Sequence, residues 1–169
     1  MVDRADTSPG QPGAEAEQEV PRLERLFKFA APHRVHHGEI DAQGVVGSGR
    51  WLDILQHGRV EYLRNLGLLS LEGLTAPVQA VVRNTAIDYL SPARFDDSLL
   101  VRVRASILGH KSAHFEFLVD NIDTSIRHVV AQVTMVCVQV SDWRSVAWPR
   151  VWRDRLEEME APNLRLRQQ

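Results

Sequence analysis

The sequence predicts an α+β fold in which a curved antiparallel sheet of about five strands wraps around one long central helix. The order of the elements indicates this: one strand-like segment, one long amphipathic segment, and then four more strand-like segments rich in Val, Ile and Phe. The apolar stripe of the amphipathic segment is broader than a single buried face requires. A helix of this kind must be covered on more than one side, and a sheet that curves around it provides that cover.

Periodicity and turn residues place each element along the chain. The first strand is expected over residues 27–37 and the long helix over 49–66, with Ser48 as its N-cap and Gly67 just after its last turn. A short helix over 148–159 is expected near the end. The four later strands are predicted at 78–90, 99–108, 113–122 and 128–140.

Length and composition indicate one globular domain. The chain has 169 residues, of which 44% are hydrophobic and 25% charged, and this is an ordinary globular balance. Residues 1–22 are rich in Pro, Gly and Glu and show almost no apolar periodicity, so they are predicted to form a flexible N-terminal tail. We therefore expect the domain over 23–160 and a C-terminal tail over 161–169.

Charge and cysteine content exclude several classes of protein. The formal net charge of −2 provides no basic field for nucleic acid, and no segment has the ~20 apolar residues of a membrane span. The N-terminus lacks the features of a signal peptide, so we expect a cytoplasmic protein with neither nucleic acid nor membrane as a partner. Cys137, the only cysteine, lies in an apolar run and is predicted to pack in the core. No cofactor is expected.

An acidic turn comes directly before the long helix. Glu39 and Asp41 stand two residues apart, and Gly44 follows them. The N-terminus of a helix can polarise a carbonyl oxygen, and a neighbouring carboxylate can act on the polarised group. The turn therefore predicts a site for acyl-transfer chemistry.

This turn and a second segment resemble motifs of the hotdog-fold acyl-CoA thioesterases, in the 4-hydroxybenzoyl-CoA thioesterase-like branch. The family places an acid, then an Asp, then a Gly before a helix that carries an aromatic residue and, eight positions on, an Arg. Its second segment is an aromatic residue followed by a Pro-Ala-Arg loop and an acid, as in residues 89–97 here. The first motif corresponds to Glu39, Asp41, Gly44, Trp51 and Arg59. The resemblance covers about residues 29–140.

The resemblance implies a reaction and a catalytic residue. Water and an acyl-CoA would give a carboxylic acid and CoA, with Asp41 acting either as the nucleophile, through a mixed anhydride, or as a general base on water. Backbone N–H groups around Gly47 and Ser48 would hold the oxyanion. The family forms dimers, and often tetramers, with the site at the subunit interface. An acyl-carrier-protein thioesterase and a non-catalytic acyl-CoA-binding module remain as alternatives.

Further residues are candidates for supporting roles at this site. Glu39, His57 and Arg59 are possible supporting residues. The sequence departs from many relatives here, because residues 45–49 contain no His or Asn, and Gln56 and His57 stand where relatives often carry Glu. The basic residues that could contact the phosphates of CoA, or simply lie on the surface, are Arg94, His110 and Lys111.

The residue spacing favours neither a serine nucleophile nor a metal site. A serine nucleophile at position 48 would need glycine at positions 46 and 50, which are Val46 and Arg50. Three histidines near the end of the first strand suggest a metal site at first sight. Strand alternation, however, sends His36 and His37 to opposite faces, so no metal site is expected.

Overall fold

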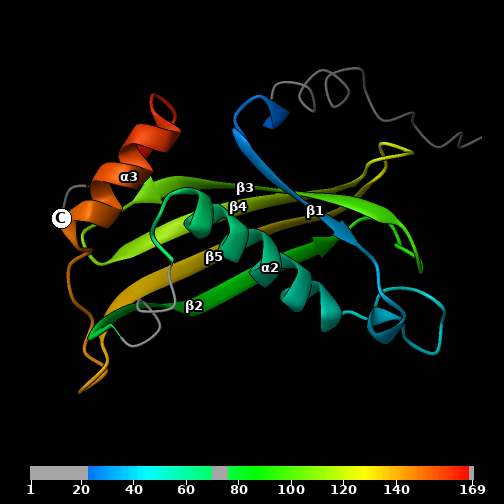
Figure 1. Ribbon diagram of the computed structural model, residues 1–169, viewed down its shortest axis with the longest axis horizontal. Coiled ribbons are helices and arrows are strands. Elements are labelled where there is room, and N and C mark those ends of the chain that lie inside the picture. The colour runs from blue at the N-terminus through cyan, green and yellow to red at the C-terminus, as the bar shows by residue number, and fades with distance from the viewer. Residues whose placement is uncertain (1–22, 70–75, 168–169) are drawn as a thin grey trace, which may run out of the picture.

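The computed structural model describes residues 23–69 and 76–167 and shows one sheet curved over a long helix (Figure 1). The predicted tail over 1–22 lies outside the described residues. The sheet order is β1-β3-β4-β5-β2, with all neighbours antiparallel, and the short β6 lies parallel to β3. The elements are β1 (Phe29–Arg34), η1 (His37–Glu39), α2 (Arg50–Asn65), β2 (Val78–Tyr89), β3 (Ser98–Leu108), β4 (Ser112–Asn121), β5 (Arg127–Gln139), α3 (Arg150–Glu160) and β6 (Arg165–Leu166). The predicted fold class is confirmed.

The first strand and the start of the helix differ from the predictions. β1 ends at Arg34 because the chain then turns into the single 3₁₀ turn η1. Ser48 is not the N-cap of α2. Gly49 occupies that position, with no side-chain capping bond, because the chain already turns at Gly47, whose carbonyl accepts the Arg50 N–H at 2.8 Å.

The end of α2 follows the prediction. Gly67 adopts a φ of +67°, a conformation that glycine allows at little cost. Its N–H donates to the Arg64 carbonyl, and the Leu68 N–H donates to the Leu63 carbonyl, both at 2.9 Å. These two bonds form a Schellman motif, which satisfies the last carbonyls of the helix. The four later strands begin and end within a residue of their predicted bounds. Within the predicted C-terminal tail, β6 pairs with β3.

The core lies between α2 and the concave face of the sheet. Gly58 permits the closest approach, because a Cβ there would lie only 2.4 Å from Cγ1 of Val101 on β3. Cys137 is buried among the core residues, and burial raises the pKa of its thiol. This confirms its predicted place in the core. The face of α2 toward the sheet buries Trp51, Ile54, Leu55, Gly58, Tyr62 and Leu63.

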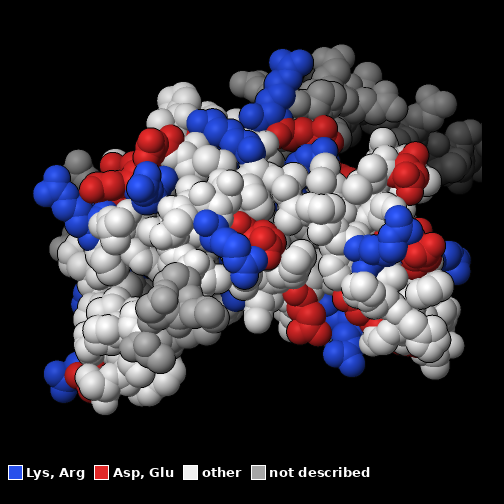
Figure 2. All heavy atoms as spheres, viewed as in Figure 1, with Lys and Arg blue, Asp and Glu red and all other residues white. Residues whose placement is uncertain are grey.

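Charges of both signs are interspersed on the face of the molecule that carries α2 (Figure 2). The described residues on this face form no large patch of a single sign. An anionic ligand bound here is therefore held by individual contacts rather than by a broad field. No helix in the described part of the chain is long and apolar enough to cross a membrane.

A buried carboxyl group joins α3 to the central helix. Glu160 is 1% exposed, and its Oε1 accepts the Tyr62 hydroxyl at 2.5 Å and the Ala105 N–H at 3.1 Å. Its Oε2 is buried and has no partner among the described residues. Burial raises the pKa of Glu160 above its ordinary value.

This raised pKa predicts a pH-dependent stability. The unfolded chain loses the Glu160 proton at the ordinary pKa, whereas the folded chain holds it to higher pH, so this contribution to stability is complete at low pH and declines as pH rises through the folded pKa. Glu160→Gln removes the titrating group. Urea unfolding at about pH 4 and about pH 8 should show that wild type loses stability relative to E160Q as pH rises. A constant difference between the two proteins would contradict the prediction.

Candidate active site

The acidic turn forms a closed loop that presents Asp41 to solvent. The Asp41 N–H donates to the Val45 carbonyl at 2.9 Å, and the Gly44 N–H donates to the Asp41 carbonyl at 3.0 Å, with Gly44 at a φ of +77°. Oδ1 of Asp41 accepts the Gln43 N–H at 2.8 Å. Oδ2 has no hydrogen-bond partner in the described part of the chain. The turn therefore fixes one carboxylate oxygen and leaves the other open.

The start of α2 lies directly beside Asp41. A Cβ built on Gly47 would be 3.6 Å from the Asp41 Cβ. The Gly47 N–H, however, already donates to the Glu39 carbonyl at 3.0 Å, so in this structure it is not free to bind a ligand. The N–H groups of Ser48 and Gly49 have no acceptor among the described residues. The open donors at this end of the helix therefore lie one position later than the sequence predicted.

Two open hollows meet at Asp41 and Ser48. One has a volume of about 350 Å³ and extends past Trp51 to Leu90 and Pro92. The other, of about 570 Å³, is lined by Glu39, Asp41, the glycine-rich start of α2 and Arg50. Because Asp41 and Ser48 line both hollows, a ligand that occupies both passes these two residues.

Two residues around the smaller hollow were not among the predicted site residues, although Tyr89 belongs to the second segment of the resemblance. Tyr89, at the end of β2, donates its hydroxyl to the Ser48 carbonyl at 3.1 Å and lines the smaller hollow. His128 packs under Trp51, with a ring-centroid distance of 6.2 Å. The pairing of β4 with β5 shifts register here, and this shift leaves His128 without a partner on β4. Strand alternation in the sequence does not reveal such a bulge.

Buried contacts fix His128 beneath the smaller hollow. Its Nδ1 lies 3.2 Å from the Ser91 carbonyl and donates to it, and Ser91 lines the smaller hollow. Its Nε2 is buried without a partner among the described residues. His128 therefore supports two walls of the hollow, Trp51 and Ser91, from below.

Glu39 lies in the same turn as Asp41, but its carboxylate makes other contacts. It accepts the His36 N–H at 2.7 Å and lies 3.1 Å from Nε2 of His33 through each of its oxygens. The structure shows no direct hydrogen bond between the Glu39 and Asp41 side chains. Direct orientation of the Asp41 side chain by Glu39 is therefore not observed, and a supporting role for Glu39 stays a prediction.

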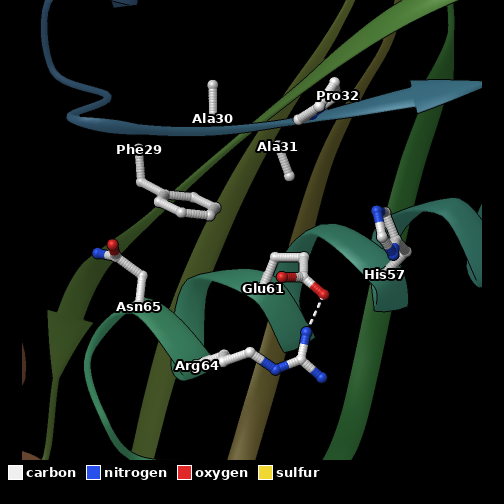
Figure 3. Close-up of a pocket in the computed structure, with 8 residues that line it drawn as sticks. All are labelled: Phe29, Ala30, Ala31, Pro32, His57, Glu61, Arg64 and Asn65. Atoms are coloured by element: carbon white, nitrogen blue, oxygen red, sulfur yellow. Dashed lines mark hydrogen bonds and ion pairs between the residues drawn. The ribbon is translucent and has the colours of Figure 1, made fainter.

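His57 lies at a separate groove between β1 and α2, shown in Figure 3. This groove has a volume of about 500 Å³ and does not include Asp41. Glu61 and Arg64 form an ion pair on its α2 side. The β1 side consists of Phe29, Ala30, Ala31 and Pro32. Within one chain, His57 is thus not brought together with Asp41.

Arg59 lies ten residues along α2 from the N-cap, a rise of about 15 Å. It is partly buried and forms no ion pair or hydrogen bond within the described residues. Burial lowers the pKa of its guanidinium. Arg59 therefore does not belong to the turn around Asp41.

The three predicted CoA contacts lie far apart. Arg94 is exposed in a loop that is joined to the acidic turn, because the Val46 N–H donates to the Ala93 carbonyl at 2.9 Å. His110 and Lys111 lie in the β3–β4 hairpin, at the end of β3 away from the turn (Figure 1). The length of β3 separates these ends by roughly 30 Å. Within one chain, only Arg94 is close to Asp41, and its contact with CoA stays a prediction.

Comparison with known proteins places the chain in a family. The model of the thioesterase-like superfamily matches residues 35–156. The acyl-CoA thioesterase YbgC of Haemophilus influenzae is 33% identical over 123 residues, which are 72% of this chain and 89% of the relative. The acyl-CoA thioester hydrolase YbgC of Escherichia coli O6:H1 is 28% identical over 125 residues, which are 74% of this chain and 91% of that protein.

Solved structures show the same fold. A 1,4-dihydroxy-2-naphthoyl-CoA thioesterase from Synechocystis superposes with a TM-score of 0.72 at 19% identity, over 79% of this chain and 98% of that one. At this identity the likeness concerns the fold, and it agrees with the sheet wrapped around α2. The chain belongs to the thioesterase-like superfamily and is a thioester hydrolase with the hotdog fold.

Proposed function

We propose that the protein hydrolyses an acyl-CoA thioester to a carboxylic acid and CoA at the turn that carries Asp41. One observation carries the proposal: a carboxylate with an open oxygen lies beside the two unpaired N–H groups of Ser48 and Gly49. The relatives named as acyl-CoA thioesterases support CoA as the thiol half of the substrate.

The helix N-terminus would stabilise the reacting carbonyl. As the thioester carbon becomes tetrahedral, negative charge develops on its oxygen, and the N–H groups of Ser48 and Gly49 can donate to it. The positive end of the helix dipole favours the same charge. Loss of one such donor typically costs about 3–4 kcal/mol of activation free energy.

Asp41 would act on the carbonyl carbon in one of two ways. As a nucleophile, its Oδ2 forms a mixed anhydride and the CoA thiolate leaves; water then hydrolyses the anhydride. As a general base, Asp41 takes a proton from water, which attacks the carbonyl and expels the thiolate. Either route consumes one water molecule and yields the acid and CoA. The open oxygen of Asp41 suits both.

A hydrolysis screen tests this function. Purified protein would be mixed with aromatic, short-chain and medium-chain acyl-CoAs, and release of the free thiol would be followed. The same acyl groups on acyl-carrier protein form the comparison. Turnover of at least one acyl-CoA with a higher kcat/KM than its carrier-protein counterpart supports the proposal. Binding of acyl-CoA without turnover would instead indicate a non-catalytic module.

The proposed active unit is a homodimer formed along β2. This twelve-residue strand is the last in the sheet, and no other strand in the described part of the chain pairs with its outer edge. An edge strand of this length favours pairing with a strand of another chain. Tyr89 ends β2 and lines the Asp41 hollow, so pairing of two β2 strands would place a second subunit beside the site. This supports a site at the subunit interface.

The mass in solution tests the dimer. Light scattering should give twice the 19.1 kDa of the chain. Val82, on β2, is 45% exposed, and Val82→Glu should give a monomer with reduced activity, because the new charge would be buried in the interface. Val151→Glu, at a 57% exposed position on α3, is the matched control and should stay dimeric. A monomeric, fully active wild type would refute the proposal.

A further inference from the structure

His33 lies behind the acidic turn and is packed among other titratable side chains. It is on β1, and its side chain is 11% exposed. Its ring contacts those of His36 and His57, with centroid distances of 5.7 and 5.6 Å. No group of three or more His, Cys, Asp or Glu side chains in the described residues is arranged to hold a metal ion. The residue must therefore be explained by its protein contacts.

The main contact of His33 is with the Glu39 carboxylate. Nε2 lies 3.1 Å from each carboxylate oxygen, and the Glu39 side chain is only 15% exposed. Because an ionised carboxylate only accepts hydrogen bonds, Nε2 must carry the proton and donate it. The His36 N–H is the second donor to the same carboxylate, at 2.7 Å. Together, the two donors hold a poorly solvated carboxylate in one position.

The backbone of Glu39 joins the two arms of the acidic turn. Its carbonyl accepts the Gly47 N–H at 3.0 Å, and the next residues of the two arms, Ile40 and Val46, form a β-bridge. Asp41 continues this pairing through its bond to Val45. The position of Glu39 thus determines where Asp41 lies and where Gly47, just before α2, lies.

We infer that His33 is a positioning residue for the proposed thioesterase reaction: by holding the Glu39 carboxylate, it fixes the turn that carries Asp41 and the N–H groups of Ser48 and Gly49. The inference rests on the proposed function. His33 itself touches no reacting atom in this account. It acts through Glu39, and a small displacement of a reacting group is enough to slow an oriented reaction strongly.

Two amide substitutions test the inference because they differ mainly in reach. The side chain of His33→Gln extends far enough to place an N–H donor near the position of Nε2, whereas His33→Asn is one methylene shorter and cannot bond Glu39. We expect H33N to lower kcat on the order of tenfold to a hundredfold with little change in KM, and H33Q to restore most of kcat. His37→Asn, at an exposed histidine without a bond to Glu39, is the control and should keep the wild-type kcat.

A double variant of His33 and Glu39 distinguishes positioning through Glu39 from a general effect on stability. If His33 acts through Glu39, the double variant H33N/E39Q should be no slower than the slower single variant. Wild-type kcat in H33N, equal losses in H33N and H33Q, or losses that multiply in the double variant would each overturn the inference. Should H33N fail to fold, H33Q, E39Q and H33Q/E39Q are compared instead. The inference then requires that H33Q keeps the kcat of the wild type and that H33Q/E39Q is no slower than E39Q.

The proposed reaction at Asp41 and the proposed role of His33 can be refuted separately. A fully active Asp41→Asn variant would remove the proposed mechanism, whatever the His33 variants show. An inactive D41N together with a fully active H33N would leave that mechanism standing and overturn only the role of His33.

Discussion

Replacing Asp41 with Asn is expected to lower kcat by about a thousandfold on any acyl-CoA that the protein hydrolyses. The amide can serve neither as a nucleophile nor as a base in this reaction. The fold should not change, because the side-chain oxygen that remains can still accept the Gln43 N–H and keep the turn closed. Thiol release gives kcat and KM, and thermal unfolding checks the fold.

The matched control for D41N is Asp53→Asn. Asp53 is also an exposed acid near the start of α2, where it pairs with Arg50 at 3.4 Å. A surface pair of this kind contributes little to stability, and Asp53 lines neither hollow at Asp41. D53N should therefore keep the activity of the wild type. Equal losses in D41N and D53N would indicate a general effect of charge at the helix start rather than catalysis by Asp41.

Replacing Gly58 with Val is expected to destabilise the protein by about 3 kcal/mol. The Cβ alone would lie 2.4 Å from Cγ1 of Val101 and 3.3 Å from Cγ2 of Val103. Both valines are fully buried in β3, so neither can move aside without disturbing the core. The helix would have to lift off the sheet. The free energy of unfolding in urea measures the cost.

Gly38→Val is the control for G58V. A Cβ at Gly38 meets nothing within 4 Å, and its φ is not in the left-handed region, so this substitution adds the same side chain without a clash. Its stability should stay close to that of the wild type. If G58V were as stable as G38V, the close contact between α2 and β3 would be contradicted.

The fold could be predicted from the sequence because its determinants are local. The broad apolar stripe of α2 and the spacing of the strand-like runs follow from side-chain periodicity alone. Gly67 could be assigned to the helix end because glycine is favoured where the backbone needs a positive φ. Ser48 was assigned wrongly as the N-cap, because the turn at Gly47 depends on a bond to Glu39 that no local pattern reveals.

The site could be predicted only in part. The spacing from Glu39 to Gly44 indicated the turn, and Asp41 is the most accessible acid in it. The location of His110 and Lys111 depends on which end of a strand meets the turn, and sequence spacing does not give that. The contacts of His33 and His128 come from tertiary packing and a bulge. Oligomeric state and a cytoplasmic location stay predictions.

The decisive test of thioester hydrolysis by Asp41 measures binding and turnover of one acyl-CoA side by side on wild type and D41N. We expect both proteins to bind the substrate with similar affinity and only the wild type to release CoA at an appreciable rate. Binding without release by both proteins would contradict thioester hydrolysis at this site. Release at the wild-type rate by D41N would contradict the role of Asp41.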